Sequence, residues 1–131
     1  MTREEFRELV EEAIDTIPGK FARKVRNLVI VIEDAASEEL LDEMEIDDSS
    51  ELLGLYQGTP LTERRWDYGN ALPDRILLFQ GPHERDADDD EVLIVSIAET
   101  LIHEIGHYFG LSEEEIEAIE EHYWRGHGAD Q

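Results

Sequence analysis

Residues 89–110 read DDEVLIVSIAETLIHEIGHYFG, a long apolar segment that begins with acidic residues and ends in glycine. Apolar residues recur in it at helical spacing, which predicts a helix from about Asp89 to Phe109 that lies in the core. The carboxylates at its start suit a helix N-terminus, because the unpaired N–H groups and the helix dipole attract negative charge. Gly110 suits its end, since glycine most easily adopts the left-handed conformation past a helix C-terminus.

Three polar residues on this predicted helix carry its chemistry: His103, Glu104 and His107. Histidines four residues apart project from one helix face, so both imidazoles can reach one metal ion. Zinc lowers the pKa of bound water toward about 7, and a carboxylate beside that water can accept its proton. A lone histidine on an apolar helix is usually a packed core residue, but this spacing favours a metal site. The pattern predicts Zn²⁺ ligands at His103 and His107 and a general base at Glu104.

A third metal ligand is expected, because a catalytic zinc site usually has three protein ligands and one open position. Gly110 reverses the chain, and Glu113 is then the best placed carboxylate. Glu113 would also be favoured at this position without a metal, since it is an acid in the first turn after the Ser112 cap. Glu114 or Glu117 could replace Glu113 as the ligand if the turn is wound differently.

Helices and strands are predicted along the rest of the chain as well. Further helices are expected over 3–17, ended by Pro18-Gly19, over 35–45, and over 113–123 after a Ser112–Glu115 capping box. Strands are expected over 27–33, which should be buried, and over 52–56 and 75–80. An irregular stretch is expected over 59–73 and a flexible tail over about 122–131. The predicted fold is one small α+β domain spanning 1–131, with a short mixed sheet packed on the metal-site helix.

Charge and composition restrict the classes of partner. The chain has 34 Asp and Glu against 11 Lys and Arg, a formal net charge of -23. This charge repels phosphate backbones and anionic lipids, which argues against nucleic-acid and membrane binding, and it favours cationic peptides and divalent metals. Without cysteine, disulfides and thiolate chemistry are excluded. No signal peptide and no apolar run of roughly 20 residues is present, so a cytoplasmic protein is expected, monomeric by default.

Three segments carry a resemblance to a known family: LLGLYQGTPLTER (52–64), LPDRILLFQGP (72–82) and ETLIHEIGHYFGLSEEEI (99–116). They resemble the short bacterial zincin-like metallopeptidases, or minimal zincins. In better-known zincins the position of Glu113 is His or Asp, so Glu there is a departure that keeps a carboxylate on a longer side chain. The resemblance implies a reduced zincin core and zinc-dependent hydrolysis of peptide bonds, but no particular substrate.

The predicted function is hydrolysis of a peptide or protein substrate through a metal-activated water. In zincins the substrate pairs along a sheet edge beside the metal-site helix, and residues 75–80 are expected to offer that edge because they lead into the helix. Candidates for the oxyanion donor are Tyr56, Arg64, Tyr68, His83 and Tyr123. The alternatives are a metal-binding, peptide-binding module without turnover, and an acidic regulatory protein in which the motif arose by chance.

Overall fold

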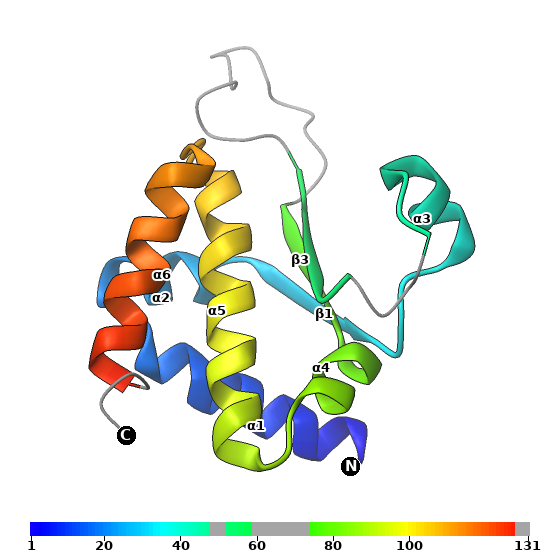
Figure 1. Ribbon diagram of the computed structural model, residues 1–131, viewed down its shortest axis with the longest axis horizontal. Coiled ribbons are helices and arrows are strands. Elements are labelled where there is room, and N and C mark those ends of the chain that lie inside the picture. The colour runs from blue at the N-terminus through cyan, green and yellow to red at the C-terminus, as the bar shows by residue number, and fades with distance from the viewer. Residues whose placement is uncertain (48–51, 59–73, 128–131) are drawn as a thin grey trace.

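The computed structural model describes residues 1–47, 52–58 and 74–127, with side chains up to residue 123. The elements in this part of the chain are α1 (Arg3–Thr16), α2 (Gly19–Arg26), β1 (Val29–Glu33), α3 (Glu38–Met44), β2 (Gly54–Gln57), β3 (Arg75–Phe79), α4 (Gln80–Asp86), α5 (Asp90–Tyr108) and α6 (Glu113–His127). Helix α5 crosses the middle of the molecule, with α6 along one side and the sheet on the other (Figure 1). The predicted α+β class is confirmed.

The sheet is mixed, as predicted, and has the strand order β1-β3-β2. Strand β1 is parallel to β3, with Ile30 opposite Ile76, and β2 is antiparallel to β3, with Tyr56 opposite Ile76. The central strand β3 is buried along most of its length. The prediction that 27–33 is a buried strand was wrong in part, because β1 is an edge strand whose Val29 is 54% exposed.

Two apolar clusters form on the two faces of the sheet, because side chains alternate along β3. Ile76 and Leu78 join the main core, in which the apolar face of α1 packs on α5. Leu77 and Phe79 point to the opposite face and pack in a smaller cluster with Leu41 of α3. Helix α5 is therefore held by apolar contacts from the sheet and from α1, which fixes the position of its polar residues.

Two helices were not predicted, and each has a proline at or near its start. Pro18 caps the start of α2, where the sequence had suggested only a break after α1. Pro82 lies in the first turn of α4, which begins at Gln80, directly after β3 and inside the strand predicted over 75–80. A proline is tolerated in the first helical turn, because its missing N–H would have no partner there.

Other boundaries differ less from the prediction. Helix α6 continues to His127 instead of ending at Tyr123. The predicted irregular stretch 59–73, with Arg64, Arg65, Trp66 and Tyr68, lies outside the described residues. None of the helices in the described ranges combines the length and apolarity needed to cross a membrane.

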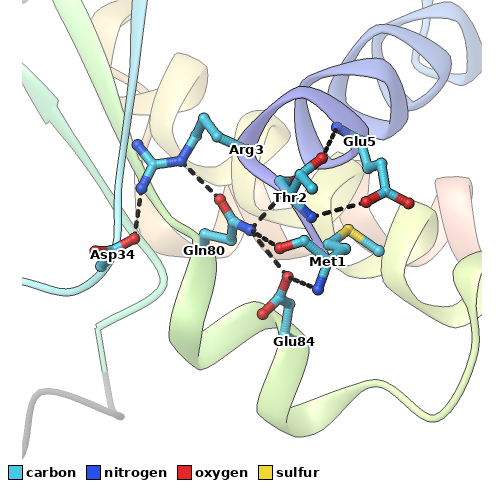
Figure 2. Close-up of polar contacts among 7 residues, drawn as sticks. All are labelled: Met1, Thr2, Arg3, Glu5, Asp34, Gln80 and Glu84. Atoms are coloured by element: carbon cyan, nitrogen blue, oxygen red, sulfur yellow. Dashed lines mark hydrogen bonds and ion pairs between the residues drawn. The ribbon is translucent and has the colours of Figure 1, made fainter.

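Polar contacts join the start of α1 to β1 and α4 (Figure 2). The Nε of Arg3 donates to Gln80 Oε1 at 2.7 Å, and its other nitrogens bond to the carbonyl oxygen of Ile32 and to Asp34. Gln80 also donates from Nε2 to Glu84 Oε1 at 2.9 Å. One arginine thus joins three elements that are distant in sequence, opposite the end of α5 that carries the histidines.

Candidate metal centre

The turn between α5 and α6 has the form that the sequence predicts. Gly110 has a φ of 73°, in the left-handed region. The N–H of Leu111 donates to the carbonyl oxygen of Gly106 at 3.0 Å. Ser112 and Glu115 form the capping box that starts α6, with both hydrogen bonds at 3.1 Å. This turn reverses the chain, so α6 runs back along α5 (Figure 1).

Three of the predicted site residues converge at this turn. His107 Nε2 lies 3.2 Å from Glu113 Oε1, and His103 Nε2 lies 3.6 Å from Glu113 Oε2. One ligand atom from each of the three residues lies within 4.8 Å of the other two. Both histidines are partly exposed and Glu113 is exposed, so the cluster is open to solvent on one side.

The donor set fits a zinc ion. Zinc is commonly held by imidazole nitrogens and carboxylate oxygens at about 2.1 Å, which places tetrahedral ligand atoms about 3.4 Å apart. The distances from the two histidine nitrogens to the Glu113 carboxylate are 3.2 and 3.6 Å, to different oxygens of that carboxylate. One ligand atom from each of the three residues lies within 4.8 Å of the others, so binding of zinc would draw these atoms closer together. The alternative ligands Glu114 and Glu117 are exposed and lie outside this cluster of described residues.

Glu104 is adjacent to the cluster but separate from it. Its side chain is buried, and its Oε1 accepts a hydrogen bond from the backbone N–H of Tyr56 on β2 at 2.7 Å. The same oxygen lies 3.5 Å from His107 Nδ1. A buried carboxylate is costly unless it is hydrogen-bonded or paired, and β2 together with His107 supplies both partners. Glu104 is thus held beside the donor atoms by a strand distant in sequence.

Two glycines allow the neighbouring elements to approach α5 closely. A Cβ added at Gly106 would lie 2.6 Å from Cγ1 of Ile116 on α6. A Cβ added at Gly54 on β2 would lie 2.6 Å from Cγ2 of Thr100 on α5. Real Cβ atoms essentially never come this close to another atom, so a side chain at either position would push α6 or β2 away.

Two residues at the cluster and the cavity beside it have raised pKa values. The hydrogen bond with Glu104 is the main cause that raises the pKa of His107 to about 9; burial opposes the shift, and Glu113 adds to it. Burial, and then the negative charge of Glu120, raise the pKa of Glu99 to about 7. The metal-free centre therefore holds a proton on His107 at neutral pH, among carboxylates that attract cations.

A cavity of about 290 Å³ lies beside the cluster, between β2, α5 and α6. Its lining includes Gly54 of β2, Thr100, His103 and Glu104 of α5, and Glu120 of α6. One wall is thus the sheet edge, and the opposite wall carries the polar residues of the motif.

The sheet edge beside α5 is β2, and not 75–80 as predicted. Strand β3 is the central strand and has a partner on both sides, so it has no edge at which another strand could add. In the described part of the chain β2 pairs only with β3, and its other side faces α5, where Tyr56 bonds to Glu104. The prediction failed because proximity in sequence to α5 does not determine strand order.

Three of the five predicted oxyanion donors can be placed. The hydroxyl of Tyr56 donates to Asp74 at 3.1 Å, and that of Tyr123 bonds to Thr16 at 2.9 Å. His83 is fully buried. Its ring nitrogens bond to the Phe79 carbonyl oxygen and the Thr100 hydroxyl, so all three candidates have structural partners in the fold. The other two, Arg64 and Tyr68, lie outside the described residues.

Glu120 is a site residue that the sequence reasoning missed. Its Oε1 lies 3.0 Å from His103 Nδ1, on the opposite side of the ring from Glu113. The signal that could have found it is a spacing of seven residues from Glu113, which is about two helical turns and places both carboxylates on one face of α6.

The profile of the family described as zincin-like metallopeptidase matches residues 25–123, more than half of the 131-residue chain. The match includes the whole of the motif helix, the turn after it and both glutamates of α6 that contact the histidines. No curated protein matches the sequence. The family implies a metal ion, usually zinc, and the structure brings together a histidine, histidine and glutamate cluster suited to one. The chain belongs to the family of zincin-like metallopeptidases.

Proposed function

We propose that the protein is a zinc-dependent peptidase in which His103, His107 and Glu113 hold the metal and Glu104 is the general base. The observation that carries the proposal is the convergence of two Nε2 atoms on the Glu113 carboxylate, with Glu104 buried directly beside them. Zinc in such a site supplies Lewis acidity and lowers the pKa of water toward about 7.

Glu104 contributes a fixed proton acceptor. One of its oxygens is held by the Tyr56 N–H and lies near His107, so the carboxylate has little freedom to rotate away from the cluster. A base that is already oriented avoids the loss of conformational freedom that a mobile side chain would incur in the reaction. It accepts the proton from the attacking water and can return it to the leaving amine.

The substrate is an extended peptide that pairs with β2 at Gly54, since the Tyr56 N–H on the same side already bonds to Glu104. The carbonyl oxygen of Leu53 accepts a hydrogen bond from Phe79 of β3. In an antiparallel pair, successive residues of a strand direct their backbone N–H and C=O groups to opposite sides, so those of Gly54 point away from β3. Gly54 also lines the cavity, so a peptide paired there could place one side chain in it. The net charge of -23 favours substrates with basic segments.

The test is cleavage of a broad peptide library by zinc-loaded wild type and Glu104→Gln. The variant keeps the size of the side chain and an oxygen for the Tyr56 N–H, but it removes the proton acceptor. We expect cleavage to fall by at least about a hundredfold, with zinc content and melting temperature near wild type. Glu114→Gln, an equal change at an exposed position of α6, should cleave as wild type does.

Two results would contradict the proposal. Cleavage by Glu104→Gln at the wild-type rate would show that another group accepts the proton. A zinc-loaded wild type that binds peptides but cleaves none would instead support a peptide-binding module without turnover.

A further inference from the structure

We propose that Glu120 is a positioning residue that fixes His103 in the tautomer a metal requires. The inference deepens the proposed function and rests on it, because it takes His103 as a metal ligand. Glu120 itself does not touch the metal or the substrate in this proposal.

The two ring nitrogens of His103 face two different carboxylates of α6. Nδ1 lies 3.0 Å from Glu120 Oε1, and Nε2 lies 3.6 Å from Glu113 Oε2. Because the two nitrogens point in different directions, an ion held by Nε2 and Glu113 cannot also be held by Glu120. The shorter contact of His103 is therefore to a residue outside the ligand set.

A carboxylate at Nδ1 determines where the imidazole proton lies. An ionised carboxylate can only accept hydrogen bonds, so Nδ1 must carry the hydrogen that the 3.0 Å contact uses. In a neutral imidazole the lone pair is then on Nε2, the nitrogen directed at Glu113. Ligand histidines generally donate from their second nitrogen in this way, which also makes the ligating nitrogen more basic.

The packing of α5 against α6 holds Glu120 at the required distance. Gly106 lets Ile116 pack directly on α5, and Glu120 is one helical turn further along α6 on the same side. The Glu120 side chain is 24% exposed against 65% for Glu113. Its hydrogen bond is thus less screened by water than a contact at the surface would be.

The experiment compares zinc affinity, by competition with a chelator, for wild type, Glu120→Ala, Glu120→Gln and the exposed control Glu117→Ala. We expect Glu120→Ala to weaken zinc binding by about 10–100-fold, the usual effect of removing such a partner. Glu120→Gln should lose less, because its amide oxygen can still accept from Nδ1. Glu117→Ala should bind as wild type does, which separates the contact from the general loss of negative charge on α6.

The second measurement is the tautomer of His103 by ¹⁵N NMR of the metal-free protein. Wild type should carry the proton on Nδ1, and Glu120→Ala should shift the population toward Nε2–H. A purely structural role for Glu120 would lower the melting temperature without changing the tautomer. If Glu120→Ala does not fold, Glu120→Gln provides the same comparison of affinity and tautomer.

The outcomes separate the two proposals. If wild type binds zinc and the Glu120 variants bind it as tightly, with an unchanged tautomer, the positioning role is wrong and the metal centre stands. If wild type itself binds no zinc, the proposed function fails.

Discussion

His83 on α4 and His107 on α5 lie in different surroundings, and their hydrogen-bond partners differ in chemistry. His83 on α4 is fully buried, and its ring nitrogens lie 2.9 Å from the carbonyl oxygen of Phe79 and 3.0 Å from the hydroxyl of Thr100. Burial is the main cause that lowers its pKa. His107 is partly exposed and faces the carboxylates of Glu104 and Glu113, and its pKa is raised to about 9.

The difference shows what makes a histidine structural and what makes it a candidate ligand. Both nitrogens of His83 are taken up by neutral groups of the fold, so it has no donor atom left for a metal. The Nε2 of His107 instead faces a carboxylate that is itself a potential ligand, with a second histidine nitrogen nearby. Burial among neutral partners therefore marks the structural histidine, and partial exposure beside carboxylates marks the candidate ligand.

The largest expected effect is on zinc affinity when a ligand histidine is removed. His107→Ala should weaken zinc binding by about a hundredfold to a thousandfold, since zinc sites with four protein ligands give about 10–16 kcal/mol, or roughly 2.5–4 kcal/mol per ligand. The exposed His122→Ala on α6 is the matched control and should bind zinc as wild type does. Equal zinc affinity in His107→Ala and wild type would remove His107 from the ligand set.

The raised pKa of His107 predicts a pH dependence of zinc affinity. A proton must leave His107 before its nitrogen can bind a metal, so apparent affinity should rise about tenfold per pH unit from pH 7 to about 9 and then level off. Calorimetry in two buffers at pH 7.5 should show about one proton released from His107 per zinc. Glu104→Gln removes the main cause of the raised pKa and should reduce this release. Zinc binding without proton release in wild type would contradict the prediction.

The smallest expected effect concerns the fold. His83→Leu keeps an apolar volume but removes the ring nitrogens that bond to the Phe79 carbonyl oxygen and the Thr100 hydroxyl, which should lower the free energy of unfolding by about 1–3 kcal/mol. Zinc stoichiometry should stay at the wild-type value. A loss of zinc with an unchanged melting temperature would reverse the roles assigned to the two environments.

The same substitution has a defined pH dependence. Because the folded state lowers the pKa of His83, its contribution to stability is fully present above the unfolded-state value of about 6.5. It is lost as the pH falls through the lower pKa of the folded state. Denaturation experiments at several pH values should therefore show the wild type and His83→Leu becoming more alike in acid.

The parts of the molecule that the sequence predicted are governed by local rules. Three features depend only on residues within a few positions of each other. They are the helical spacing of apolar residues in α5, the left-handed turn at Gly110 and the Ser112 capping box. Convergence of Glu113 with the two histidines follows from the same turn. The helix–turn–helix could therefore be read from residues 89–123.

The parts that the sequence did not predict depend on tertiary contacts. Strand β3 is the central strand of the sheet, whereas the sequence predicted that residues 75–80 offer an edge. The apolar residues of 75–80 suit a central strand and an edge strand equally well. Glu120 is one of many glutamates, and only the packing of α6 on α5 brings it to His103. The start of α2 at Pro18 was misread because proline can both end one helix and begin the next.

The bond between Glu104 and Tyr56 has a consequence for the order in which the site assembles. The three candidate ligands lie within residues 103–113 and need only α5, the turn and the start of α6. The base needs β2, and Tyr56 is 48 residues away in the chain. Contacts between residues close in sequence form sooner and with less loss of chain entropy than distant ones. A partly folded chain, or one from which β2 has detached, would thus keep the three candidate ligands together while the Glu104 carboxylate is free to rotate away from them.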